Sequence, residues 1–325
     1  MIDIVLATYN GESFLEEQIQ SIQNCIDYSG LVSRLIIVDD GSSDNTIHLI
    51  QRCAKQDHKI ELHLNDSGCH GPIHNFSYGL SKTTSEYIML SDQDDVWLPE
   101  KLTLSLQSIQ NLQADSTGLP ALVFSDKVIV DEKLNVLCSS YFELKNIPKT
   151  WHHHFNQLCQ QNVVSGCTTL MNRALLNKAL PIPEQVYMHD WWLALVAHRC
   201  GEIHFIDQAL IQYRQHSSNT IGASQRSLIS LFCKFNMHFK AFKQSQQSVI
   251  QQAISFKYFE QKNKLSSDET ISILCSLNDL TITKKMSYFC KGKVTRSHFL
   301  GRVALLVSLL ASTNKSIKKQ TIKNE

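Results

Sequence analysis

The chain of 325 residues lacks several patterns that define common classes of protein. Its ten cysteines include no CxxC pair, so neither a zinc ribbon nor a thioredoxin-type motif is predicted, and a reduced, cytoplasmic setting is expected. No GxGxxG or GxxxxGKS/T pattern occurs near the first strands, which argues against a dinucleotide-binding domain and a P-loop NTPase. A metal ion would then have to neutralise any bound phosphates in place of a glycine-rich loop.

Secretion signals and long apolar runs are also missing. The first residues, MIDIVLATYNGE, contain no basic segment and no cleavage site, and they are predicted to form a strand rather than a signal peptide. The longest apolar stretch, residues 299–311, is interrupted by Arg302 and is shorter than the ~20 residues that a spanning helix needs. A transmembrane helix is therefore not predicted.

Basic residues are scarce relative to acidic ones in the first two thirds of the chain, and acidic residues are scarce in the last third. Residues 1–222 carry 14 Lys and Arg against 25 Asp and Glu, a net charge of −11, whereas residues 223–325 carry 17 against 5, a net charge of +12. The second region has only two glycines and no proline, and its pattern is mainly helical. We expect a domain boundary near Gly222, with an acidic domain suited to a metal-dependent site and a basic region suited to an anionic surface.

The acidic region alternates strand and helix patterns. Apolar runs at residues 2–8, 34–40, 59–65 and 86–92 are predicted to be strands, separated by segments with helical periodicity. Further strands are expected at 121–137 (two, around a turn), 163–172 and 201–216, and a helix at 189–200. The predicted fold class is α/β, with a Rossmann-like, mainly parallel sheet flanked by helices. Ligands bind such sheets beyond the carboxyl ends of the strands.

Polar residues gather where three of these strands end. The segments are Thr8–Glu12, Asp39–Ser42 and SDQDD, which holds Asp92, Asp94 and Asp95. Asp92 and Asp94 are the predicted ligands of Mg²⁺ or Mn²⁺, with Asp95 as a further candidate, because such ions prefer oxygen. Capping of the following helix is the alternative. Three acids are more than capping needs, and their mutual repulsion favours the metal site.

Other candidates are weaker when they are taken alone. Asp40 suits either a structural turn or a hydrogen bond to a base or ribose, and Tyr9 suits either packing or stacking on a base. Asp190, at the start of HDWWLALVAHRC, fits a helix cap or a general base beside an aromatic wall. Arg214 and His216 belong to a polar loop that is either solvated or turned toward a diphosphate.

The basic region ends in an apolar segment flanked by lysines, residues 284–312. This combination fits an interfacial helix on an anionic membrane. It equally fits a helix packed on the domain with its lysines in solvent, and the sequence alone does not choose between them.

Seven motifs, taken in order, resemble those of glycosyltransferase family 2. They are ATYNGESFLEEQIQSI, IIVDDGSSDNT, GPIHNFSYGL, YIMLSDQDDVWLPEKL, SGCTTLMNRALL, HDWWLALVA and YRQHSSNTIG, and they span residues 1 to about 222. The set is most similar to the rhamnosyltransferase-like branch of bacterial surface polysaccharide synthesis. The resemblance implies a GT-A fold, a nucleotide-diphospho-sugar donor, a divalent cation and inversion at the anomeric carbon.

The resemblance also assigns roles to residues. Ala7, Tyr9 and Glu12 match the segment that holds the base, Asp40 matches the aspartate that contacts the nucleoside, and Asp92-Gln93-Asp94 matches the DxD motif that contacts ribose and metal. Asp190 matches the catalytic base, although His189 precedes it where the family more often has Glu. Arg214 and His216 match a loop on the diphosphate side.

The expected donor is dTDP-L-rhamnose, with another dTDP- or UDP-hexose next, and the expected acceptor is a saccharide or a lipid-linked saccharide at the inner membrane face. No nucleic-acid partner is expected. A non-catalytic nucleotide-sugar-binding protein is the rival. A nucleotidyltransferase would need a basic, glycine-rich first loop, and LATYNGESFLEEQ has one glycine and no basic residue.

Overall fold

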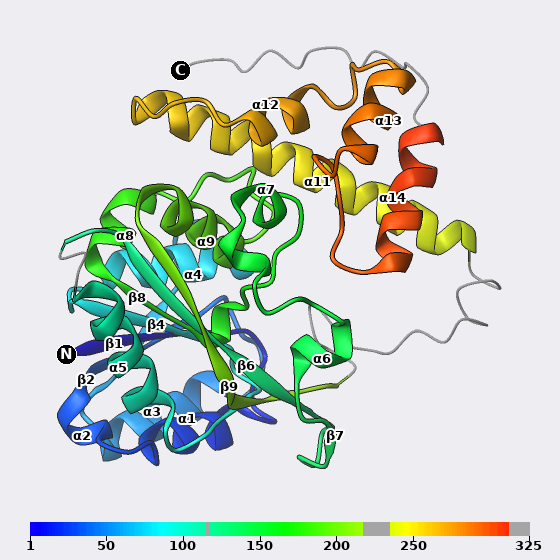
Figure 1. Cartoon of the computed structure of the whole chain (residues 1–325). Helices are drawn as coiled ribbons and strands as arrows, with labels where there is room; N and C mark the ends of the chain where they lie inside the picture. Colours follow the sequence, from blue (N-terminus) through cyan, green and yellow to red (C-terminus); the bar gives the residue numbers. More distant parts are fainter. Residues whose placement is uncertain (115–117, 217–234, 312–325) are drawn as a thin grey trace. The chain divides into compact units, whose positions relative to one another are not determined.

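The computed structural model describes residues 1–114, 118–216 and 235–311, which form two compact units (Figure 1). Of these residues, unit 1 contains those up to 216 except 159–161, and unit 2 contains 159–161 and 235–311. The predicted boundary near Gly222 lies outside the described residues.

Unit 1 is built on one mixed sheet. Its strands run in the order β3 (Ile60–Leu64), β2 (Val32–Asp39), β1 (Ile2–Thr8), β4 (Tyr87–Ser91), β8 (Thr169–Asn172), β6 (Ala121–Val130), β9 (Glu202–Arg214) and β5 (Val96–Trp97), with β7 (Val136–Cys138) paired to β6. The first four are mutually parallel, and β9 is parallel to β6, whereas β8, β5 and β7 run antiparallel to their neighbours. The mainly parallel α/β sheet predicted from the sequence is confirmed.

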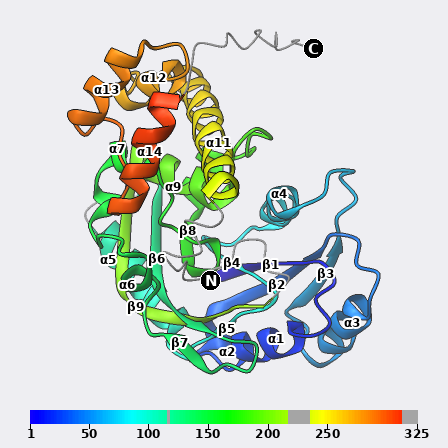
Figure 2. The same cartoon turned by 90° about the vertical axis from the view of Figure 1, so that its right-hand side faces the viewer.

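Helices cover both faces of the sheet (Figure 2). One face carries α1 (Leu15–Gln23), α3 (Thr46–Gln56) and α5 (Lys101–Gln113), whose apolar side chains share a core with β1 and β2. The other face carries α4 (Pro72–Lys82), α8 (Arg173–Ala179) and α9 (His189–Cys200). Short helical segments complete the unit: α2 (Tyr28–Leu31), α6 (Tyr141–Lys145), η1 (Trp151–His153), α7 (Phe155–Leu158) and η2 (Gly166–Thr168).

Alternation along β1 explains how both faces are packed. Ile2, Ile4 and Leu6 enter the core under α1 and α3, while Val5 faces α4. There a Cβ on Gly79 of α4 would lie 2.4 Å from Val5 Cγ1, so only glycine allows the helix to approach the sheet this closely. This contact holds α4 close against the sheet on the face that it shares with the strands β1, β2 and β4, whose carboxyl ends border the site described below.

The predicted strand at 163–172 is shorter than expected. Only Thr169–Asn172 form β8, because Gly166–Thr168 turn as η2. The hydroxyl of Thr168 donates to the carbonyl of Ser165 (2.7 Å), and that of Thr169 donates to the carbonyl of Gly166 (2.8 Å). Such local side-chain bonds compete with strand pairing, and the turn that results brings Gly166 and Cys167 to the site described below.

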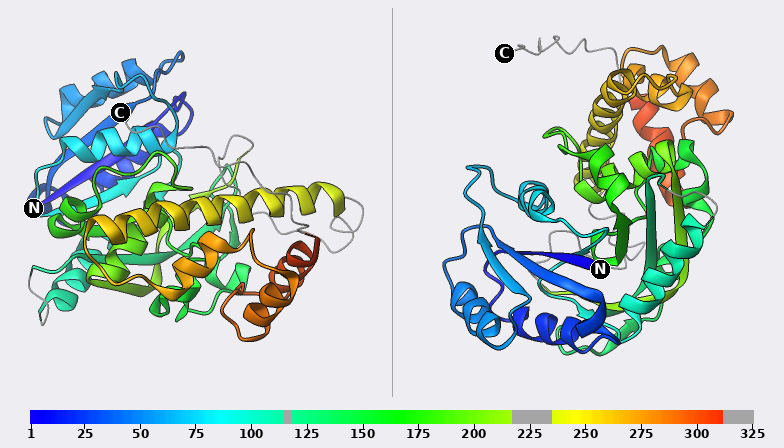
Figure 3. Two further views of the ribbon diagram at one scale, coloured as in Figure 1. Left: turned by 90° about the horizontal axis from the view of Figure 1, so that it is seen from above. Right: turned by 90° about the vertical axis from the view of Figure 1, so that its left-hand side faces the viewer.

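Unit 2 is helical, as the sequence predicted. It contains α11 (Phe235–Lys262), α12 (Glu269–Ser276), α13 (Ile282–Cys290) and α14 (Phe299–Ala311), which Figure 3 shows beside one another. Residues 159–161 join this unit through Gln160, whose carboxamide donates to the carbonyl of Lys293 (3.1 Å) and accepts from the N–H of Thr295 (2.9 Å). No helix among the described residues is long and apolar enough to cross a membrane.

Candidate active site

Gln93, the middle residue of the DxD motif, ties the end of β4 to the end of β1. Its Oε1 accepts hydrogen bonds from the Thr8 hydroxyl (2.7 Å) and the Tyr9 N–H (2.8 Å), and its Nε2 donates to the Tyr9 carbonyl (3.2 Å). A Cβ on Gly11 would lie 2.4 Å from the same Oε1, which accounts for glycine at that position. The sequence singled out only the acids on either side of Gln93.

The loops after β1 and β2 are also bound to each other. Asn10, which has a φ of 47°, receives the N–H of Ser43 on its Oδ1 (2.9 Å). Glu12 accepts from the N–H and the side chain of Asn45 (2.9 and 3.0 Å), just before α3 begins. Glu12, predicted to help hold the base, therefore braces the loop that borders the site, and that binding role stays a prediction.

Asp40 anchors a third loop, residues 65–71. Its carboxylate accepts from Asn65 Nδ2 (2.8 Å) and the Gly71 N–H (2.7 Å), and it lies 3.0 Å from His70 Nδ1. Nearby, Ala7 lies opposite Val38 at the ends of β1 and β2. Tyr9 is 56 % exposed, so its ring is available for stacking rather than packed in the core. The base and nucleoside contacts of these residues stay predictions.

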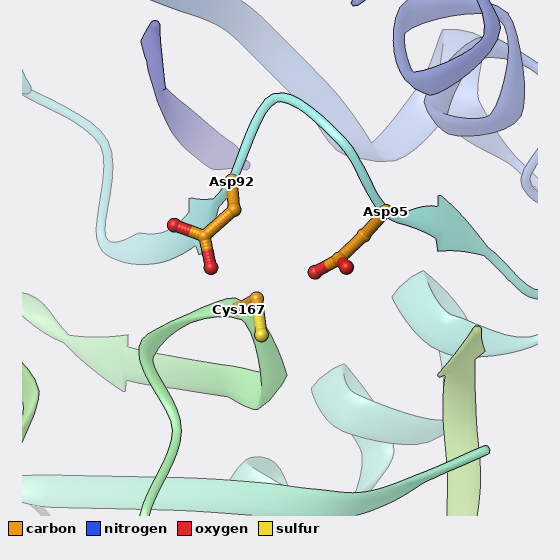
Figure 4. A group of neighbouring side chains, drawn as sticks. All are labelled: Asp92, Asp95 and Cys167. Carbon is orange, nitrogen blue, oxygen red and sulfur yellow. The ribbon is translucent and has the colours of Figure 1, made fainter. Parts of the chain in front are cut away.

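Asp92, Asp94 and Asp95, which we call the β4 acid cluster, divide into two groups. Figure 4 shows Asp92 and Asp95 at the two ends of the loop after β4, with both carboxylates on the same side of the loop and the thiol of Cys167 next to the gap between them. The ligand atoms of these three residues lie within 4.8 Å of one another. Asp94 instead lies beside His216, with 2.7 Å between Oδ2 and Nε2.

The β4 acid cluster is electrostatically strained. Burial, followed by repulsion from Asp94 and, more weakly, from Asp190, raises the pKa of Asp92 to about 7, against an opposing effect of Lys127. Burial, followed by repulsion from Asp94 and Asp92, raises the pKa of Asp95 well above its usual range. In the described part of the chain, Oδ2 of Asp95 has no hydrogen-bond partner. Such a group is costly unless a cation or proton compensates it.

Lys127 supplies one fixed positive charge beneath the β4 acid cluster. It projects from β6, is buried, and lies over the rings of Tyr213 (3.7 Å) and Tyr141 (4.5 Å). Its ammonium donates to the hydroxyl of Ser165 (2.9 Å). Lys127 belongs to none of the predicted site motifs, although a lysine inside the apolar run ALVFSDKVIV is a signal in the sequence.

Arg214 lies beside the β4 acid cluster but is turned into the protein. Its guanidinium is 2 % exposed and donates to the carbonyls of Asp94 (2.8 Å) and Glu132 (2.6 Å) and to the carboxylate of Glu17 (2.5 Å). Its backbone N–H donates to Asp95 (3.3 Å). Arg214 thus holds the loop that carries the acids, and its predicted contact with a diphosphate stays a prediction.

Asp190 reaches the same site from the first turn of α9. Its Oδ2 accepts from the N–H of Gly166 (3.1 Å), and its Oδ1 accepts from Asn162 Nδ2 (3.0 Å) and from the N–H of Trp191 (2.6 Å). The bond from Gly166 holds the carboxylate against η2, the turn that also carries Cys167. The sequence singled out Asp190 but gave no signal for Asn162.

The residues around Asp190 are core rather than a sugar-binding wall. Trp191 and Trp192 are 2 % and 1 % exposed, and their indole N–H groups donate to the carbonyls of Leu158 (2.7 Å) and Ala179 (2.9 Å). His189 stacks on Phe76 of α4 with ring centroids 4.2 Å apart, and burial lowers its pKa. The aromatic wall considered for these residues is therefore not available to a ligand.

The donor set fits a hard divalent cation at one end of the cluster. Asp92, Asp94 and Asp95 offer carboxylate oxygens, which suit Mg²⁺ or Mn²⁺, and His216 lies beside one of them, Asp94. Burial raises the pKa of Cys167 well above its usual range, so its thiol is a weak ligand for such ions and acts as a hydrogen-bond donor to the carboxylates instead.

Comparison with known proteins supplies the family. The model of glycosyl transferase family 2 matches residues 3–180. The chain is 28 % identical to the dTDP-rhamnosyl transferase RfbG of Shigella flexneri over 67 % of this chain and 74 % of that protein. It is 34 % identical, over 33 % of each chain, to the GalNAc(5)-diNAcBac-PP-undecaprenol beta-1,3-glucosyltransferase of Campylobacter jejuni.

Solved structures agree on the fold. S. aureus TarS 1–349 in complex with UDP-GlcNAc has a TM-score of 0.55 at 13 % identity, covering 95 % of this chain and 90 % of that one. The mannosyltransferase PcManGT of Pyrobaculum calidifontis in complex with GDP-Man and Mn²⁺ has a TM-score of 0.53 at 14 % identity, covering 95 % and 86 %. With its family model matched over more than half of its length, the chain belongs to glycosyltransferase family 2, the nucleotide-sugar glycosyltransferases of GT-A fold.

Proposed function

We propose that this enzyme performs an inverting glycosyl transfer, with Asp190 as general base and Mg²⁺ or Mn²⁺ at the β4 acid cluster. The observation that carries the proposal is the convergence of Asp190 with that cluster. The negative charge of Asp190 lies close enough to Asp92 to raise the pKa of Asp92. Asp190 and Asp92 nevertheless belong to different elements, far apart in the sequence. A base and a cation-binding corner on one side of a sheet are the parts that such a transfer requires.

Each protein group has a stated task in this mechanism. The carboxylates of the β4 acid cluster would bind the cation, Asp92 would also contact the ribose, and His216, beside Asp94, would act on the diphosphate side. When bound, the cation supplies Lewis-acid neutralisation of the diphosphate leaving group. Asp190, oriented by Gly166 and Asn162, accepts the proton of the acceptor hydroxyl as that hydroxyl attacks the anomeric carbon from the face opposite the diphosphate.

For the donor we propose dTDP-L-rhamnose, with another dTDP- or UDP-hexose as the alternative. The named relative from Shigella flexneri uses a dTDP-rhamnosyl group and covers two thirds of this chain. The open ring of Tyr9, beside Ala7 and Glu12, would stack on the base, and Asp40 would contact the nucleoside from its anchored loop. Arg214 would act on the diphosphate side through the loop that it holds.

For the acceptor we propose a saccharide or a lipid-linked saccharide in cell-surface polysaccharide synthesis, at the inner face of the cell membrane. The name of the relative from Campylobacter jejuni includes a saccharide linked to a lipid diphosphate, PP-undecaprenol. The +12 charge of residues 223–325 suits an anionic membrane surface.

The test is a panel of nucleotide sugars incubated with the purified chain, Mn²⁺ and a lipid-linked saccharide, with the product anomer assigned by NMR. The proposal expects transfer from dTDP-L-rhamnose or a related hexose with inverted configuration. Retention of configuration would contradict the mechanism. Donor binding without transfer or hydrolysis would support the non-catalytic rival instead.

A further inference from the structure

Helix α14 is apolar on the side that faces solvent as well as on the side that packs. Its buried positions, among them Leu305 and Leu309, lie against the rest of unit 2, and the Ser308 hydroxyl donates to Gln246 of α11 (2.5 Å). Its exposed positions carry one polar side chain, Arg302, and five apolar ones. We call these five the α14 ridge: Phe299 (77 % exposed), Leu300 (50 %), Val303 (41 %), Val307 (37 %) and Leu310 (48 %).

The exposed face of α14 differs from that of an ordinary packed surface helix. Such a helix buries its apolar face and turns polar residues to water. Helix α3 of unit 1 does so, since every one of its exposed positions is polar: His48, Gln51, Arg52, Lys55 and Gln56. The sequence left two alternatives for this segment, an interfacial helix or a packed one. The structure shows a helix that is packed on one side and carries a second apolar face on the other.

The positive charge of this part of the chain indicates what binds the second apolar face of α14. Residues 223–325 have a net charge of +12, to which Lys315, Lys318, Lys319 and Lys323, in the sequence that follows α14, contribute. A second copy of the chain would bring the same positive charge to the contact and would be repelled. An anionic lipid surface offers both an apolar layer for the ridge and negative headgroups for the lysines.

The length of α14 determines how the helix can lie in a bilayer. A helix of 13 residues is about 20 Å long, less than the ~30 Å hydrocarbon core of a bilayer, so it cannot span the membrane. We propose that α14 lies in the plane of an anionic bilayer, with Phe299, Leu300, Val303, Val307 and Leu310 inserted at the boundary of headgroups and acyl chains. The inference rests on the proposed function in one respect only: the purpose of membrane binding by α14 would be to hold the active site near a lipid-linked acceptor.

The experiment is co-sedimentation of the full chain with vesicles of phosphatidylcholine, with and without phosphatidylglycerol. The wild type should bind the anionic vesicles, and added salt should weaken that binding. Phe299→Ser/Leu300→Ser should lower the partition coefficient at least about tenfold, because two large apolar groups no longer enter the bilayer. The matched control is Val136→Ser/Leu137→Ser on β7, where the two side chains are 61 % and 62 % exposed; it should bind within about twofold of the wild type.

A second variant reports insertion without depending on a loss of binding. All four tryptophans lie between residues 97 and 192, so Phe299→Trp places the only tryptophan of unit 2 on the α14 ridge. Its emission should shift to shorter wavelength when anionic vesicles are added, and it should not shift with phosphatidylcholine alone.

Three results would overturn the inference. They are equal vesicle binding by the wild type and Phe299→Ser/Leu300→Ser, an unshifted Phe299→Trp emission, and a dimer in sedimentation velocity that this double variant converts to monomer while vesicle binding stays the same. The last would identify a second copy as the occupant. Donor turnover with a water-soluble acceptor should be unchanged in the double variant, so failure of the membrane inference is separate from failure of the proposed function.

Discussion

The two edges of the parallel sheet each bury a carboxylate, and they compensate it in opposite ways. At the amino edge, Asp3 of β1 accepts from Arg34 (2.7 Å), from the N–H groups of Thr84 (2.7 Å) and Ser85 (3.0 Å), and from the Ser85 hydroxyl (2.8 Å). At the carboxyl edge, Asp95 accepts one long bond from the N–H of Arg214 (3.3 Å) and one from the thiol of Cys167, a weak donor, and in the described residues its Oδ2 has no partner.

The pKa values of the buried carboxylates are shifted in opposite directions at the two edges. Burial alone would raise the pKa of Asp3, but Arg34 and the hydrogen bonds of Ser85 and Thr84 lower it below its usual range. At Asp92 and Asp95 burial is followed by repulsion among the acids, and their pKa values rise. The amino edge therefore uses its carboxylate for stability, whereas at the carboxyl edge Lys127 and Cys167 compensate the carboxylates only in part, and a bound cation would relieve the remaining repulsion.

The largest expected effect is at the carboxyl edge. Asp190→Asn keeps the shape of the side chain and removes the base, so the rate of sugar transfer should fall about 10²–10⁴-fold while donor binding, measured by calorimetry, changes little. Asp207→Asn is the control, because Asp207 is an exposed acid paired with Lys149. Transfer at the wild-type rate by Asp190→Asn would remove Asp190 from the proposed role.

The next effect is on stability at the amino edge. Asp3→Asn removes the nearer charged partner of the Arg34 guanidinium, which keeps Glu61 at 3.6 Å, and weakens the charge-assisted hydrogen bonds at this edge; it should cost about 1.5–3 kcal/mol of the free energy of unfolding, measured with urea at pH 7. Because the pKa of Asp3 is lowered on folding, its stabilising effect is present above its ordinary pKa of 3.8 and is lost as the pH falls through the lowered value. A cost below about 1 kcal/mol would show that this edge is no better compensated than the other.

The smallest effect is a pH dependence of opposite sign at the carboxyl edge. Asp92 has a pKa of about 7 when folded and 3.8 in its ordinary state, so the folded protein holds a proton that the unfolded chain releases. In EDTA, stability should fall as the pH rises from about 4 to 7, and Asp92→Asn should be more stable than the wild type at pH 8 by about 1–3 kcal/mol. An equal stability difference at pH 4 and pH 8 would contradict the raised pKa.

Much of the first half of unit 1 followed from local sequence. Continuous apolar runs gave β1 to β4, and the polar segments at their ends gave the rim loops, because a parallel sheet brings those ends to one edge. The resemblance to the family supplied Asp190. The short strand β5 was missed, since two residues, Val96 and Trp97, carry no periodicity of their own.

What the sequence did not predict depends on contacts between distant residues. Arg214 lies 119 and 120 positions from the acids whose loop it holds, and a polar stretch such as YRQHSSNT gives no sign of whether an arginine points outward or inward. The split of the β4 acid cluster, with Asp94 beside His216 and Asp92 and Asp95 beside Cys167, likewise depends on where β9 and η2 end in space. Periodicity and spacing along the chain do not contain that information.

The most direct test of the account is the binding of Mn²⁺ in the presence of a nucleoside diphosphate, followed by electron paramagnetic resonance. We predict one tightly bound ion per chain, an affinity at least about tenfold weaker in Asp94→Asn, and an unchanged affinity in the folded fraction of Asp3→Asn. Equal affinity in Asp94→Asn and the wild type, or full sugar transfer in excess EDTA, would contradict the claim that the β4 acid cluster holds a catalytic cation.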